Sequence, residues 1–183
     1  MKLRLLISLI LITAVGTTAF ASSRALLSDQ ATLAANTFST GTVDLQISNS
    51  QATSSPNNGS FTDNTTGFTD SILPGATPKT KIFWLRNNST DVDMTIAAQT
   101  ASLSGNIDPT KVTVAIAPVD STGADTAAAV SQTLSQWTSA GTVNSTIVHG
   151  GKQRFRMSVS LASDVTTAGN TQFDVIFTGT QTP

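Results

Sequence analysis

The stretch with the clearest pattern in this chain reads Arg154-Phe155-Arg156-Met157-Ser158-Val159-Ser160-Leu161. Apolar and polar side chains alternate along its whole length. A period of two places the apolar side chains on one face of an extended strand and the polar side chains on the other. The stretch therefore predicts a β-strand with one face against a core and one face toward solvent.

The same alternation recurs on both sides of this stretch, in segments 42–48, 80–86, 92–98, 112–116 and 171–178. Gly, Asn and Pro lie in the joints between them. Leu73-Pro74-Gly75 predicts a type II turn, and Pro118 is expected to end the strand before it because it lacks an amide donor. Segment 49–70 predicts a long surface loop or a short irregular hairpin, held by Phe61 and Phe68. Seven or so short strands with such joints predict an all-β jelly roll or β-sandwich.

Segment 124–139 is the one place where the pattern favours a helix. Ala127, Val130, Leu134 and Trp137 recur at spacings of three to four residues, and the segment is rich in alanine. Both features are typical of an α-helix. We therefore expect one short helix in an otherwise all-β domain.

Composition limits the classes of function. The chain has 183 residues, which suits one domain, and 39% of them are hydrophobic, enough to bury a core. Only 11% are charged, against about 25% in ordinary domains, and the formal net charge is -1. Nothing in this balance attracts nucleic acid or an anionic membrane. The chain contains no cysteine, so its core must form without disulfides.

The N-terminus predicts a secretory signal peptide. Lys2 and Arg4 precede an apolar run that ends near Phe20, and small residues follow at cleavage-type spacing. The expected leader is 1–21, with cleavage after Ala21 or as late as Ala25. The alternative is a transmembrane anchor, but the run is shorter than the roughly 20 apolar residues that an anchor needs. We expect a secreted chain with no stable membrane anchor after cleavage.

The segment after the leader has an apolar face of its own. Read with a period of two, one face carries Ala25, Leu27, Ala31, Leu33 and Ala35 and is broken only by Asp29. This predicts a half-buried strand, and the alternative is a short helix or a frayed leader. A strand with little local partner must bury its apolar face elsewhere, for example on the open sheet edge of another subunit. The sequence then divides into a leader, a donor-strand segment at 22–40 and a folded domain at 41–183.

The side chains needed for most catalytic and metal sites are missing. His149 is the only histidine and there is no glutamate, so no multi-histidine metal site and no histidine-based triad can be assembled. We expect no catalytic residue, no metal ligand and no cofactor. Asp91 and Asp93 are two apart on an expected strand, where they would hold calcium or simply form a solvated edge. His149-Gly150-Gly151 is expected to be a loop.

Two further patterns concern the surface. Lys152, Arg154 and Arg156 form a basic face on one strand, which we interpret as a solvated face or a contact between subunits. Asn-x-Ser/Thr triplets are candidate N-glycosylation sites. Five occur, all in expected loops, at Asn58, Asn64, Asn87, Asn88 and Asn144.

Three stretches together resemble the family of the biofilm fibre protein TasA and the camelysin-like protein CalY. The first joins the leader to Leu26-Leu27-Ser28-Asp29 and then to Phe38-Ser39-Thr40-Gly41-Thr42-Val43-Asp44-Leu45. The second is Leu73-Pro74-Gly75 followed by a strand and Asn87-Asn88, and the third runs from Gly169-Asn170 to Gln181. They are spread over most of the chain. Archaeal bundling pili look similar in design, and the Thr-rich composition would suit them.

The resemblance implies a jelly-roll subunit of an extracellular filament, joined head to tail by donor-strand complementation. The residues implied for the donor strand are Ala25, Leu26, Leu27, Ala31, Leu33 and Ala35. Leu26-Leu27 departs from the aromatic pair usual in the family, which leaves the donor register open. Some camelysin-like members are described as metallopeptidases, an activity that one histidine and no glutamate do not support. The alternatives to the filament subunit are a secreted metallopeptidase of the camelysin-like kind and a monomeric surface-binding module whose N-terminal strand joins its own sheet.

Overall fold

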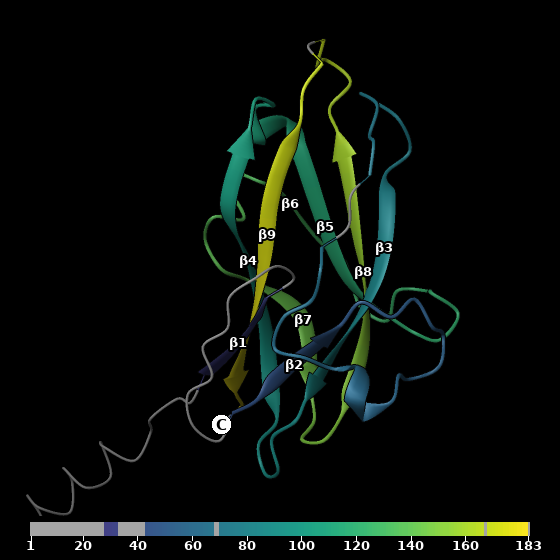
Figure 1. Cartoon of the computed structure of the whole chain (residues 1–183), viewed down its shortest axis with the longest axis vertical. Coiled ribbons are helices and arrows are strands. Elements are labelled where there is room, and N and C mark those ends of the chain that lie inside the picture. The colour runs from purple at the N-terminus through teal and green to yellow at the C-terminus, as the bar shows by residue number, and fades with distance from the viewer. Residues whose placement is uncertain (1–27, 33–42, 68–69, 167, 183) are drawn as a thin grey trace, which may run out of the picture.

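The computed structural model describes residues 28–32, 43–67, 70–166 and 168–182, and only the backbone of 28–32. These residues form two antiparallel β-sheets that face each other across one core (Figure 1). The expected leader and both expected cleavage sites lie outside the described residues. Within the described ranges, no helix is long and apolar enough to cross a membrane.

The first sheet has four strands in the order β1-β9-β4-β7. Their bounds are Ser28–Thr32 for β1, Thr171–Gln181 for β9, Met94–Gly105 for β4 and Gly141–Ile147 for β7. The second sheet has five strands in the order β2-β3-β8-β5-β6. Their bounds are Leu45–Ser48 for β2, Lys79–Asn87 for β3, Lys152–Leu161 for β8, Val112–Val119 for β5 and Val130–Thr133 for β6.

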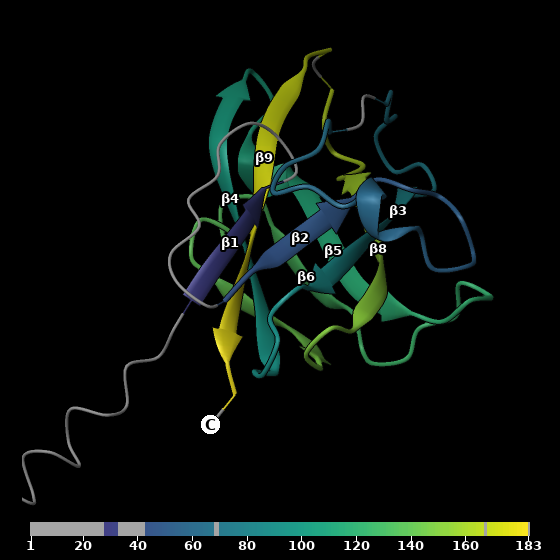
Figure 2. The same ribbon diagram turned by 60° about the horizontal axis from the view of Figure 1, so that its bottom comes forward.

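Four strand pairs are nested inside one another along the chain. β5 pairs with β6, β4 pairs with β7, β3 pairs with β8, and β1 pairs with β9, all antiparallel. The chain therefore behaves as one long hairpin that has been rolled so that successive pairs fall in alternate sheets. β2 is an addition to this scheme at the edge beside β3. In Figure 2, β1 and β2 lie at the front, where they close one side of the two sheets.

The core consists of the inward side chains of both sheets. Phe83 and Phe155 stack within the five-stranded sheet with ring centroids 5.5 Å apart, and Phe83 meets Phe177 of the four-stranded sheet at 5.0 Å. All three are completely buried. Phe155, Met157 and Leu161 are buried as the alternation predicts. The all-β prediction is confirmed.

The helix expected at 124–139 is wrong. The structure has strand β6 at Val130–Thr133, and its only described helices are two 3-10 turns at Asn58–Ser60 and Pro109–Lys111. After β6 the chain makes a single tight turn, in which the amides of Gln136 and Trp137 both donate to the Thr133 carbonyl. This turn brings Leu134 and Trp137 to the same side, so the helical spacing is real but extends over one turn only.

The turn and loop predictions are mostly confirmed. The Ala76 amide donates to the Leu73 carbonyl at 3.1 Å, and Gly75 has a φ of 67°, as a type II turn requires. Phe61 is buried and anchors the long loop after β2, whereas Phe68 lies outside the described residues. Pro118 does not end its strand, because β5 continues to Val119. β6 pairs with β5 only as far as Ile116, so no residue of β6 lies beside Pro118 to accept from the amide that proline lacks.

Candidate functional site

Among the described residues, the main irregularity is an edge of β9 that is only half covered. β4 pairs with β9 from Thr171 to Gln181, whereas β1 pairs on the opposite side only from Ile176 to Thr180. Within the described part of the chain, no strand pairs with the outer side of Thr171–Val175. Five residues of strand span about 17 Å. A row of backbone donors and acceptors of this length is a template for another strand.

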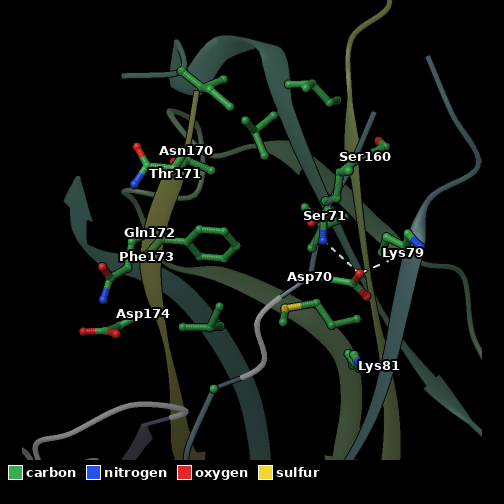
Figure 3. A pocket seen from close by; sticks show the side chains of 18 of the residues that line it. Asp70, Ser71, Lys79, Lys81, Ser160, Asn170, Thr171, Gln172, Phe173 and Asp174 are labelled. Atoms are coloured by element: carbon green, nitrogen blue, oxygen red, sulfur yellow. Dashed lines mark hydrogen bonds and ion pairs between the residues drawn. The ribbon is translucent and has the colours of Figure 1, made fainter. Parts of the chain in front are cut away.

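A groove of about 750 Å³ lies between this length of β9 and the start of β3. Its floor is apolar and comes from both sheets. Phe173 points into it from β9, as Figure 3 shows, while Gln172 and Asp174 point away. The other apolar side chains that line the groove are Ile72, Ile107, Val112, Met157, Val159, Leu161 and Val175. Phe173, Ile72, Ile107 and Val159 are only partly buried, so the residues that the structure describes do not fully cover this end of the core.

The rim of the groove carries charges of both signs. Asp70, Lys79 and Lys81 line it beside the start of β3. The Asp70 carboxylate accepts a hydrogen bond from the Ser71 amide at 2.9 Å and lies 3.8 Å from the Lys79 ammonium (Figure 3). Apolar side chains on the floor and charges of both signs on the rim suit a strand with one apolar face and one polar face.

The groove exists because β1 and β2 are both shorter than the strands they pair with. β2 covers β3 only from Trp84 to Asn87, and β1 covers β9 only from Ile176. The two short strands therefore close one half of this side of the molecule, and no other described strand closes the other half. Sequence patterns reveal where strands occur, but they do not reveal how far a partner extends along them.

Only part of the expected donor segment is described. A strand is present at Ser28–Thr32, and Ala31 lies opposite Phe177 of the same chain. The remaining expected donor residues, Ala25, Leu26, Leu27, Leu33 and Ala35, lie outside the described residues. The strand thus pairs with its own sheet, which is the arrangement that a monomeric module would have.

One member of the acidic pair, Asp93, contacts the histidine. Asp91 and Asp93 precede β4, so the expectation that they lie on a strand is wrong. The Asp93 carboxylate accepts from the His149 amide at 2.9 Å and contacts the His149 Nδ1 at 3.1 Å. The hydrogen bond from that amide, followed by the one from the ring, lowers the pKa of Asp93. No group of three or more potential metal ligands occurs among the residues described.

The basic face of β8 holds a neighbouring loop. The Arg154 guanidinium is 7% exposed and donates to the carbonyls of Asp120 and Ser121 at 2.9 and 3.2 Å. Arg156 donates to the Gly123 carbonyl at 3.1 Å and to the Asp125 carboxylate at 2.6 Å. These two side chains therefore bind a loop of their own subunit, and the interpretation of the strand as a solvated face is wrong for Arg154.

Asp120 in the same loop is expected to make the stability of the fold depend on pH in acid. The Asp120 carboxylate accepts from the Thr122 hydroxyl and from the Ala124 amide, and these bonds lower the pKa of Asp120 below its ordinary value of 3.8. A lowered folded-state pKa stabilises the fold above the ordinary value, and this contribution is lost as the pH falls through the lowered one. We expect the difference in melting temperature between wild type and Asp120→Asn to be constant above about pH 5 and to shrink below about pH 4. A difference that does not change between pH 6 and pH 2.5 would contradict this account.

The five candidate glycosylation sites differ in accessibility. Asn58 and Asn64 are exposed in the loop after β2, and Asn88 is half-buried, with its amide 2.5 Å from the Asp44 carboxylate. Two of the expected loop positions are wrong, because Asn144 lies exposed within β7 and Asn87 ends β3. Asn87 is completely buried, and its amide nitrogen donates to the carbonyls of Val92 and Ile147. That nitrogen is the atom a glycan would need, so Asn87 is excluded in the folded chain.

Comparison of the chain with protein-family models, with curated proteins and with solved structures gives no match. The site therefore rests on its geometry alone.

Proposed function

We propose that this protein is a structural subunit of an extracellular filament, without catalytic activity, that polymerises head to tail by strand exchange. The observation that carries the proposal is the half-covered edge of β9 above an apolar groove. The incoming strand is the segment after the leader of a neighbouring subunit. A contact between two different surfaces of identical subunits does not close, so it generates a filament.

The nested strand pairs support a jelly-roll fold for the subunit. Without β2, the two sheets have the orders β1-β9-β4-β7 and β3-β8-β5-β6. Eight strands wound in this way into two sheets are the arrangement of a jelly roll. β1 is then the first strand of the roll. It lies at a sheet edge and is joined to the rest of the sheet only through β9.

Strand exchange from this position costs little free energy, because hydrogen bonds between β1 and β9 of one chain are replaced by the same hydrogen bonds between two chains. The five residue pairs between β1 and β9 can form equally well when β1 comes from another copy. The neighbouring segment can also continue past Ile176 and cover Thr171–Val175, which the strand in its own subunit does not reach. This additional pairing and the burial of Phe173 favour the polymer over the closed monomer.

A monomeric binding module is the second candidate, and one observation favours it. β1 pairs with β9 of its own chain, and a groove of about 750 Å³ falls within the usual range of roughly 300–1,000 Å³ for ligand pockets. Under this alternative the groove holds a small ligand and the secreted protein stays monomeric at every concentration.

A reversible disulfide between β1 and β9 distinguishes the filament subunit from the monomeric binding module. Gln30 lies opposite Thr178 in the β1–β9 pair, and Thr178 alternates with the buried Phe177 and Gly179, so it lies on the outer face of the sheet. The double variant Gln30→Cys/Thr178→Cys has only this pair of cysteines, because the natural chain has none. The oxidised, intramolecularly bridged protein is expected to stay monomeric, and the reduced protein is expected to form filaments visible by negative-stain electron microscopy.

Two further results decide the question. Gln30→Cys alone, kept reduced, is the matched control and is expected to polymerise like the parent. If the bridge forms between subunits, oxidised filaments run as a ladder of covalent oligomers in a non-reducing gel, which supports exchange directly. Filaments formed by protein whose bridge is intramolecular would overturn the proposal, and the absence of filaments from every variant would favour the monomeric module.

A further inference from the structure

The groove has a second open edge, and it belongs to β3. β8 pairs with β3 from Lys79 to Arg86, whereas β2 covers the other side only from Trp84 onward. If β2 continued past Ser48 in the same register, Ser50 would lie opposite Ile82. The chain instead leaves the sheet after Ser48 and enters the long loop.

A side chain takes the place of the missing strand. The Gln51 amide nitrogen donates to the Ile82 carbonyl at 2.6 Å, and the Ile82 amide donates to the Gln51 side-chain oxygen at 3.3 Å. Ile82 is two residues from Trp84, the last β3 residue that β2 covers. Alternate residues of an antiparallel strand direct both backbone groups to the same neighbour, so Ile82 is the next position at which an added strand would bond.

A carboxamide presents an N–H donor beside a carbonyl acceptor, as a peptide group does, and has a second N–H to spare. Gln51 can therefore satisfy both groups of Ile82 while presenting no further backbone for pairing. The Asn49 carbonyl also accepts from the Gln51 amide nitrogen, at 3.1 Å, which fixes the direction of the side chain. No comparable side chain is hydrogen-bonded to the outer side of Thr171–Val175 in the ranges that the structure describes.

We propose that Gln51 is a specificity-determining residue that caps the β3 edge against strand addition, so that the groove receives a strand on β9 only. The partner that it excludes is the β3 edge of a second copy of this chain. Two uncapped β3 edges are identical and can pair antiparallel about a twofold axis, which gives a closed dimer in place of a filament. The role of β9 in this inference rests on the proposed function, but the capping of β3 does not.

Hydrogen exchange at the Ile82 amide tests the cap on the monomer. In Gln51→Ala that amide is expected to exchange about threefold to tenfold faster than in the parent, because one modest hydrogen bond is lost. Gln51→Glu is expected to act in the same direction at pH 7, because its carboxylate would face the carbonyl oxygens of Ile82 and Asn49 and would be repelled from the position that accepts from the Ile82 amide. The matched control is Gln46→Ala, which removes a glutamine of β2 whose side-chain oxygen accepts from Arg86 at 3.5 Å and should leave Ile82 unchanged.

Sedimentation of the same variants tests the consequence. Gln51→Ala is expected to form dimers at concentrations where the parent does not, and Thr80→Lys added to it should reverse this, because an edge lysine opposes pairing. Unchanged exchange at Ile82 in Gln51→Ala would overturn the inference, and so would faster exchange without any dimer up to millimolar concentration. Neither measurement requires filaments, so the inference can fail while the proposed function stands, and the reverse is equally possible.

Discussion

Replacing Asn87 by alanine is expected to lower the free energy of unfolding by about 3–5 kcal/mol. The side chain is completely buried at the end of β3. It donates to the carbonyls of Val92 at 2.7 Å and Ile147 at 3.0 Å, and it accepts from the Ser89 amide at 3.0 Å. These contacts tie the β3–β4 connection to the end of β7, so alanine would leave one donor and two acceptors without partners in the interior.

Thermal unfolding followed by circular dichroism measures this effect. A loss of this size corresponds to a decrease in melting temperature of roughly 10 °C for a domain of this length. Asn87→Asp has the same shape but brings a carboxylate against two carbonyl oxygens, and we expect it to be at least as unstable. The control is Asn88→Ala, where a half-buried bond to Asp44 is lost and a change of less than about 1 kcal/mol is expected. A melting temperature of Asn87→Ala within 2 °C of the parent, by the same relation, would refute the assignment.

Replacing Trp137 by alanine is expected to have the other large effect, about 4–6 kcal/mol. The indole is 1% exposed and is the largest fully buried side chain described. Its ring nitrogen donates to the Val114 carbonyl of β5 at 2.9 Å, while its own carbonyl accepts from the Thr100 amide of β4 at 2.8 Å. The residue therefore links the two sheets on the side opposite β1 and β2. Alanine would leave a cavity and remove the hydrogen bond from the indole to β5.

Urea unfolding of Trp137→Ala and Trp137→Phe separates the two contributions. Phenylalanine keeps most of the apolar volume and loses the ring donor, so we expect it to cost only about 1–2 kcal/mol. Equal losses for the two variants would mean that packing of the indole contributes little. Such a result would contradict the role of Trp137 as the link between the sheets.

Strands were predictable from this sequence because each has one face in the core and one face outside. Phe155, Met157 and Leu161 show this directly, since these side chains are buried while Arg156, Ser158 and Ser160 between them are partly exposed. The prediction for segment 124–139 was wrong because one turn after a short strand places apolar side chains three to four residues apart, as a helix does. Alanine-rich composition then favoured the longer helix, although the neighbouring β5 provides a strand partner for Val130.

The open groove was not predictable in the same way. It depends on where β1 and β2 stop relative to β9 and β3, and these ends are set by contacts between residues far apart in the chain. Gln51 gives no signal in the sequence either, because a polar residue in a polar loop is ordinary there. Asn87 gives a misleading signal, since the Asn-Asn-Ser motif is typical of exposed loops. Its side chain is in fact buried and hydrogen-bonds to the carbonyls of Val92 and Ile147.

The antiparallel register of β1 against β9 also bears on how a filament would carry tension. Ser28 lies opposite Thr180 and Thr32 lies opposite Ile176. The folded domain of the donor subunit follows Thr32, so tension in the filament would pull β1 from that end and, directed along the strand, would strain all the rungs of the pair at the same time. Rupture would then require them to break together and not one after another. A short edge strand that is easy to exchange at rest would in this way resist sliding under load.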